Sequence, residues 1–269
     1  MGSRRLINLV LLVLVGAAAA LLLTGRGGPQ GPPRVTRLDP ATIARITVER
    51  EAGATLAFVR RAGEWRMTEP LHVGANPIRI DAILQLLVAR SRDRIRVAGA
   101  DLRSLGLDPA PVTVHVNDRV LRLGGTDPVG GLRYVLYDGT VHLIKDTLFP
   151  QLTQPTAFFV DPRLLPAAAI SRITYPDHAL YRDADGWHGG PQAAVTAAAW
   201  QQAEALRVLP YRQAAAGGRI LIQSGAAAIA FDPVTAGGAP LLVRADLGIA
   251  YQLSRTTAAA LGLDPYLHD

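Results

Sequence analysis

The fold is decided by the stretch ARITVEREAGATLAFVRRAGEWRM, residues 44–67, because a related stretch, SRITYPDHALYRDADGWHG, follows at residues 171–189. Both begin with Arg-Ile-Thr, pass through a turn into a second apolar run, and close on a tryptophan, Trp65 or Trp187. Apolar and polar residues alternate as in half-buried strands, and glycines fall where hairpin turns are needed. We therefore expect an internal duplication whose copies each open with three strands.

A helix is expected after each tryptophan, beyond a polar loop that contains proline. In the first copy, apolar residues follow the i, i+3, i+4, i+7 spacing of a helix face. They are Ile80, Ile83, Leu84 and Leu87, with Asp81 near the amino end and Arg90, Arg92 and Arg94 near the carboxyl end, as the helix dipole favours. In the second copy, the predicted helix contains Ala199, Trp200, Ala203, Leu206 and Leu209 and stops at Pro210.

Each copy then returns to strands. The first copy has predicted hairpins at residues 112–123, around Asn117-Asp118, and at residues 133–144, around Asp138-Gly139. Their counterparts are residues 219–231 and 241–254, and short helical segments follow at residues 146–152 and 256–261. The predicted fold class is α+β, with two tandem, mainly antiparallel β-sheet units that each carry a packed helix.

The amino-terminal segment LINLVLLVLVGAAAALLL, residues 6–23, has no charge and is long enough for a transmembrane helix. A cleavable signal peptide is the alternative, because small residues stand at 17–20, and a twin-arginine export signal is a further one. The expected organisation is a cytoplasmic tip and transmembrane helix (1–25), a Gly/Pro-rich linker (26–40), a first repeat (41–165) and a second repeat (166–269). A short tail before a first apolar segment usually stays in the cytoplasm. We expect a single-pass protein of the bacterial inner membrane with its carboxyl-terminal domain in the periplasm.

Composition excludes several classes of protein. The chain of 269 residues has no cysteine, so it is not a disulfide scaffold, an iron–sulfur protein or a cysteine-nucleophile enzyme. Its net charge of +6 is uneven, because residues 4–96 carry 15 basic and 7 acidic side chains and the rest carries 13 and 15. Arg90, Arg92, Arg94 and Arg96 form a cluster for which we expect anionic lipid, an acidic partner or a merely solvated surface, and not nucleic acid.

Several motifs together resemble a known bacterial family. They are the Ile-Thr opening, the hairpin closed by tryptophan, Leu-Gly-Leu-Asp-Pro at residues 105–109 and Tyr-Val-x-x-Asp-Gly at residues 134–139. In these the chain resembles the domain of unknown function 4340 family, over residues 41–165 most clearly. The resemblance implies a membrane span, an extracytoplasmic repeat domain and a partner of the gliding-motility type of ABC transporter. It carries over no catalytic residue.

Motifs that carry chemistry are scarce. The sequence has no P-loop and no Gly-x-Ser-x-Gly elbow. Its histidines have no metal-binding helical spacing; they are His72, His115, His142, His178, His188 and His268. Asp183, Asp185 and Gly186 are better explained by a hairpin turn than by a calcium loop. Trp65 and Trp187 are better explained as core residues than as ligand-stacking rings.

The function expected from these features is that of an accessory or scaffold protein. It would serve a transport or cell-envelope complex through protein–protein contacts, possible because hairpin-rich sheets leave edges that accept a strand. No catalytic, cofactor-binding or metal-binding residue is assigned, and no cofactor is expected. One alternative is an envelope hydrolase that uses His115, His142 and Asp138. Another is a small-ligand module with an apolar pocket between the copies.

Overall fold

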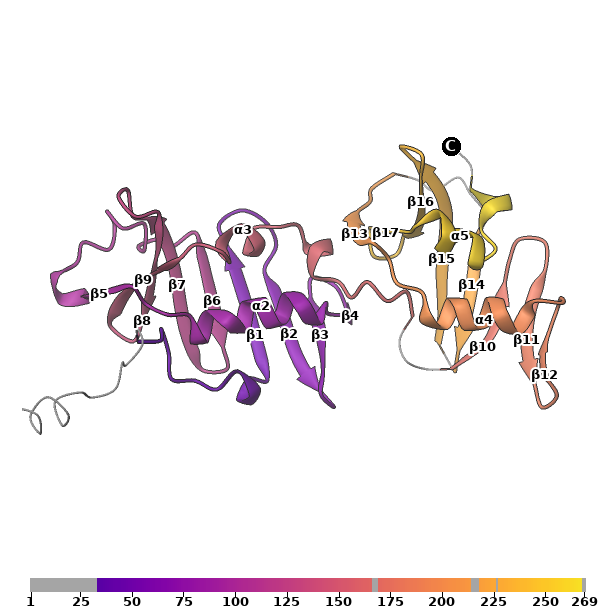
Figure 1. Cartoon of the computed structure of the whole chain (residues 1–269), viewed down its shortest axis with the longest axis horizontal. Helices are drawn as coiled ribbons and strands as arrows, with labels where there is room; N and C mark the ends of the chain where they lie inside the picture. The colour runs from indigo at the N-terminus through magenta and orange to yellow at the C-terminus, as the bar shows by residue number, and fades with distance from the viewer. Residues whose placement is uncertain (1–32, 166–168, 214–217, 226, 268–269) are drawn as a thin grey trace, which may run out of the picture.

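The computed structural model describes residues 33–165, 169–213, 218–225 and 227–267. Their strands form two antiparallel sheets that lie side by side along the length of the molecule (Figure 1). We call the sheet of nine strands with its helices the first unit, and the sheet of eight strands with its helices the second unit.

The first unit is a nine-stranded sheet with one long helix, α2 (Pro77–Val88), packed on one face (Figure 1). Its elements are η1 (Pro40–Thr42), β1 (Arg45–Arg50), β2 (Leu56–Arg61), β3 (Glu64–Glu69), β4 (Val73–Gly74), α2 (Pro77–Val88), β5 (Asp93–Arg96), η2 (Val97–Gly99), β6 (Val112–Val116), β7 (Arg119–Thr126), β8 (Leu132–Tyr137), β9 (Thr140–Lys145), α3 (Phe149–Leu152) and η3 (Thr156–Phe159). Its strand order is β4-β3-β2-β1-β6-β7-β8-β9-β5.

The second unit repeats this arrangement. Its elements are β10 (Ile170–Thr174), β11 (Ala179–Asp183), β12 (Gly186–His188), α4 (Ala193–Gln202), β13 (Arg207–Pro210), β14 (Ile220–Ser224), β15 (Ala227–Ala236), β16 (Ala239–Arg244), β17 (Ile249–Gln252), α5 (Arg255–Ala260) and η4 (Asp264–Tyr266). Its order, β12-β11-β10-β14-β15-β16-β17-β13, matches the first unit strand for strand once β4 is set aside.

The register confirms the duplication that the opening stretches predict. Ile46 pairs with Phe58 and Val116, and Ile173 pairs with Leu180 and Ile222. Both isoleucines are 0% exposed. The tryptophans also occupy matching places, because Trp65 lies opposite Arg60 as Trp187 lies opposite Arg182. Trp65 belongs to the core as expected, whereas Trp187 is only half-buried.

Each sheet has one buried face, and a helix packs on it. The predicted helix of the first unit is confirmed as α2, whose buried residues include Ile80, Ile83, Leu84 and Leu87. Asn76 caps it by accepting hydrogen bonds from the N–H groups of Ile78 and Arg79, and Pro77 occupies the first turn, where a missing N–H costs nothing. Residues of the expected linker also join this unit, since the N–H groups of Val35 and Thr36 donate to the carbonyls of Ala89 and Leu87.

Two of the predicted helix ends are wrong. Helix α2 ends at Val88, and Arg94 lies in strand β5, which pairs with β9. Helix α4 ends at Gln202, and Leu209 lies in strand β13, which pairs with β17. Pro210 is part of that edge strand, where a residue without an N–H is tolerated. The first unit therefore has two more strands than we expected, β4 and β5, and the second unit has one more, β13.

The predicted fold class is also wrong. The described chain is mostly β, with two antiparallel sheets and few helices, and not α+β. No helix within the described residues is both long and apolar enough to span a membrane. The segment for which a transmembrane helix was expected, residues 6–23, lies outside the described residues.

Candidate functional site

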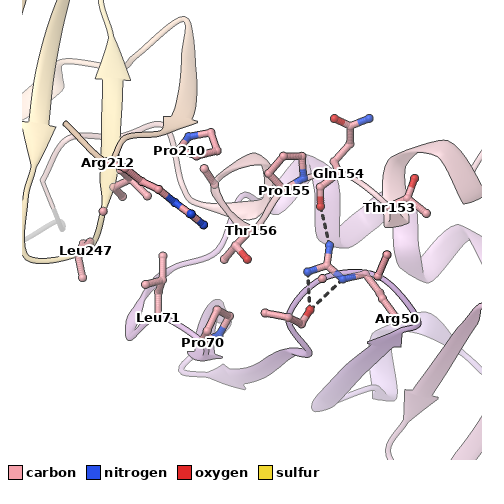
Figure 2. A pocket seen from close by; sticks show the side chains of 16 residues that line it. Arg50, Pro70, Leu71, Thr153, Gln154, Pro155, Thr156, Pro210, Arg212 and Leu247 are labelled. Carbon is pink, nitrogen blue, oxygen red and sulfur yellow. Dashed lines mark hydrogen bonds between the residues drawn. The ribbon is translucent and has the colours of Figure 1, made fainter.

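The two units meet at a cleft of about 480 Å³, which we call the junction cleft. Both units line it (Figure 2). The first unit contributes the β1–β2 turn, the β3–β4 loop and residues 153–157, from the end of α3 into η3; the second contributes the end of β13 with Arg212 and residues 247–249, from the β16–β17 turn into β17. The sheet edges β4 and β13 face this junction (Figure 1). The site therefore exists only because the chain folds into two units.

Arg50, the last residue of β1, forms the wall on the first unit. Its Nε donates to the carbonyl of Ala54 at 2.9 Å and its Nη1 to the carbonyl of Gln154 at 2.6 Å. Nη1 also reaches the carbonyl of Leu152 at 3.5 Å, and Nη2 makes a short contact with the Ala54 carbonyl. Burial lowers the pKa of this guanidinium group. All four contacts are to neutral carbonyls, so Arg50 is held in place while its charge is uncompensated.

Gly53 makes this arrangement possible. Its φ is +107°, a conformation that side chains rarely adopt, and a Cβ atom there would stand 3.4 Å from Cζ of Arg50. The β1–β2 turn can therefore close under the guanidinium group, and any larger residue would strain the turn.

Arg212 forms the opposite wall, on the second unit. Its side chain extends toward the space between the units; in Figure 2, Thr156 lies between it and Arg50, and Pro70 and Leu71 lie below. Arg212 is exposed and has no hydrogen bond or ion pair with the described residues. Leu247, from the β16–β17 turn, adds apolar surface beside it. The second wall thus offers a cation with no partner among the described residues, next to an apolar patch.

The junction cleft has the chemistry of a binding site. Its described lining holds two arginines, the hydroxyls of Thr153 and Thr156, several apolar side chains and three prolines, but no aspartate, glutamate or histidine. Two uncompensated cations favour an anionic group, and the leucines and prolines favour apolar atoms beside it. None of these side chains is an ordinary general base at neutral pH. Only the two threonine hydroxyls are potential nucleophiles, and they are weak acids.

The connecting segment, residues 160–165 between η3 and β10, fixes the two walls relative to each other. The N–H of Asp161 donates to the carbonyl of Gly74 on β4, and the N–H of Leu164 donates to the carbonyl of Ala203 in the second unit. Arg163 Nη2 and Nε donate to Oδ2 of Asp161 at 2.6 and 2.9 Å, and Nε also donates to Oδ1 at 3.2 Å, which raises the pKa of Arg163. The segment therefore bonds to both units through its backbone, and the shape of the cleft follows from that bonding.

The structure does not bring together the residues of the hydrolase hypothesis. His115 is on β6 and His142 is on β9, and strands β7 and β8 lie between them. Neighbouring strands are about 4.8 Å apart, so three steps separate the two imidazoles by roughly 14 Å. Asp138 lies in the β8–β9 turn. His115 instead lies 3.3 Å from Glu49, and His142 is buried opposite Arg94.

Other predicted residues have structural roles. Asp183 and Gly186 close the β11–β12 hairpin, so the turn prediction is confirmed, and His188 Nε2 bonds to Asp183 at 2.8 Å. The described residues contain no group of three His, Cys, Asp or Glu side chains that could hold a metal ion, and His268 lies outside them. Arg90, Arg92, Arg94 and Arg96 are exposed at the far edge of the first sheet, on β5 and just before it.

Sequence reasoning missed Arg50 and Arg212. Neither lies in a motif, and the two come from copies that are far apart along the chain. One available signal was that Arg50 ends a predicted strand directly before a glycine-containing turn.

Comparison with known proteins identifies a family but no function. A family model described as Domain of unknown function (DUF4340) matches residues 65–205, which is more than half of the chain. The matched residues run from Trp65 through the connecting segment and α4. No curated protein and no solved structure matches the chain.

Proposed function

The chain belongs to the DUF4340 family, as its motifs predicted, and from that premise we propose that it is a binding subunit that holds a partner protein in the junction cleft. In this role it would serve as an accessory or scaffold protein of a transport or cell-envelope complex. The observation that carries the proposal is the cleft itself, to which both units contribute and which has uncompensated cations on both walls.

The structure of the cleft suits binding. Arg50 is preorganised by backbone carbonyls, so little side-chain entropy is lost when a ligand meets it. The connecting segment fixes the distance between the walls through hydrogen bonds to both units. A partner that contacts both walls would be recognised by the pair of units, which gives a physical reason for the duplication.

A small anionic ligand is the second candidate occupant. The volume of about 480 Å³ lies within the range of about 300–1,000 Å³ that is usual for small-molecule sites, and polar groups converge on it. The hydrolase alternative receives no such support, because His115 and His142 are on strands that are not neighbours.

Site-directed photocrosslinking tests the proposal. The full chain is produced in its own cells with p-benzoylphenylalanine in place of Ala52 on one wall or Pro210 on the other, both of which are exposed. The control position is Val129, which is 96% exposed in the β7–β8 loop. We expect both cleft positions to crosslink the same protein and the control to crosslink none. Crosslinks from Val129 only, or different products from the two walls, would reject the proposal.

A further inference from the structure

We propose that the junction cleft binds an extended, acidic peptide segment of the partner, with carboxylates facing Arg50 and Arg212 and apolar side chains on the leucines between and beside them. This inference rests on the proposed function and names the chemistry of the partner. It follows from three features of the cleft, which are its charge, its apolar surface and its openness.

The positive charge of the cleft favours a negatively charged ligand. Arg50 makes hydrogen bonds to carbonyls only, and Arg212 has no partner among the described residues. Five other described arginines of the two units do have carboxylate partners, for example Arg133 with Asp146 and Arg244 with Asp246. The cleft thus places together two cations that have no carboxylate partner in the part of the chain that the structure describes, and a carboxylate can pair with a guanidinium group in a bidentate geometry.

The apolar surface of the cleft indicates that the ligand also carries apolar side chains. Leu71 on one wall and Leu247 on the other are half-buried, and Pro70, Pro155 and Pro210 present apolar rings. In an extended peptide, successive side chains point to opposite sides. A segment that alternates acidic and apolar residues can therefore direct one set to the arginines and the other to the leucines.

The openness of the cleft favours a peptide over a small molecule. Small-molecule sites usually bury about 70–90% of their ligand. Here the cleft is open to solvent, and most of its lining is exposed, including Ala52, Gly53, Thr153 and Pro210. An open cleft between two units admits a chain that enters at one end and leaves at the other.

Fluorescence anisotropy of the full chain at low salt tests this inference with two labelled peptides. One is Glu-Leu-Asp-Ala-Glu-Leu-Asp-Ala, and the other is its neutral counterpart Gln-Leu-Asn-Ala-Gln-Leu-Asn-Ala. We expect saturable binding of the acidic peptide and at least about tenfold weaker binding of the neutral one, because only carboxylates pair with the guanidinium groups.

Two variants locate the effect. Arg212→Gln should weaken binding of the acidic peptide about two- to fivefold, since an exposed pair of charges contributes modestly. Arg182→Gln removes an exposed arginine of the second unit that does not line the cleft, and it should leave binding unchanged. Both positions are on the surface, so neither variant should disturb folding.

Three results would overturn the inference. The first is that both peptides bind equally well, or that neither binds. The second is that the two variants bind the acidic peptide equally well. The third is that inorganic phosphate displaces the peptide at the concentrations at which the peptide itself binds. The last result would identify a small-anion site. If the peptides fail while crosslinking from Ala52 and Pro210 still captures one partner, the proposed function stands and only the acidic class is wrong.

Discussion

The first and second units share one strand order but fill the space under their helices differently. In the first unit, α2 buries five aliphatic side chains, which are Ile80, Ile83, Leu84, Leu86 and Leu87. In the second unit, α4 buries two alanines and Trp200, which is 0% exposed. One indole thus replaces several aliphatic groups. The two units therefore share strand order and register, whereas different side chains fill the space between helix and sheet in each.

The largest effect is expected from Trp200, because one side chain fills the core under α4. Trp200→Ala should lower the free energy of unfolding by about 3–5 kcal/mol, since it leaves a large cavity and removes the indole N–H bond to Tyr175. Urea denaturation followed by circular dichroism measures the change. A loss below about 1 kcal/mol would show that neighbouring residues already fill this space.

A truncation in the first unit should lower the free energy of unfolding by less, because the buried surface of α2 is spread over five side chains. Ile83→Ala should lower the free energy of unfolding by about 2–4 kcal/mol, through lost apolar burial and a smaller cavity. The same denaturation experiment makes the comparison direct. If Ile83→Ala proves more damaging than Trp200→Ala, the contrast between a divided and a concentrated core is wrong.

The two units should also differ at high pH. Burial raises the pKa of Tyr251 on β17 to about 12, and burial likewise raises the pKa of Tyr175 to about 12. A raised folded-state pKa means that this stability is complete below pH 10, the usual pKa of tyrosine, and is lost as the pH rises toward 12. For Tyr251 the loss should approach about 2–3 kcal/mol.

Tyr251→Phe provides the measurement, as the difference in unfolding free energy between wild type and variant from pH 8 to 12. The wild type should lose more stability than the variant above about pH 10. Parallel curves for the two proteins would contradict the prediction.

The first unit should respond at low pH instead, with the smallest effect of the four. His142 on β9 is buried, and burial followed by the charge of Arg94 lowers its pKa. Since the folded state disfavours the charged imidazole, this contribution is complete above about pH 6.5, the usual pKa, and falls as the pH drops below it.

His142→Gln cannot titrate and isolates this contribution. The difference in unfolding free energy between wild type and His142→Gln should shift in favour of the variant between about pH 6.5 and 5. A difference that is constant with pH would mean that protonation of His142 is not linked to folding.

Local chemistry explains what could be predicted from the sequence. The hairpin turns at Asn117 and Asp138 were predictable because both residues tolerate the positive φ that these turns require, 49° and 45°. Helix α2 was predictable because its apolar spacing has a single helical interpretation. The opening strands were predictable because the Arg-Ile-Thr stretches recur with a tryptophan at the same distance from the second strand.

Non-local strand pairing explains which elements could not be predicted from the sequence. Strands β5 and β13 are four-residue edge strands, and β5 reads Asp-Arg-Ile-Arg, so neither shows the alternation of a longer strand. Their partners β9 and β17 lie far along the chain, so the local pattern of the apolar run after α4 does not distinguish a strand from more helix. A pocket between the copies was one of the alternatives that the sequence left open, but its residues could not be predicted, since Arg50 and Arg212 line one cleft only when two complete units lie side by side.

Hydrogen–deuterium exchange of the full chain, with and without the partner captured by crosslinking, tests most directly whether binding needs both units. We predict protection on both walls of the junction cleft, at residues 50–54 and 153–157 of the first and at residues 210–212 and 247–249 of the second. The distal edges β5 and β12 should exchange as they do without the partner. Protection confined to one wall, or found at a distal edge instead, would contradict a cleft that binds its partner with both units.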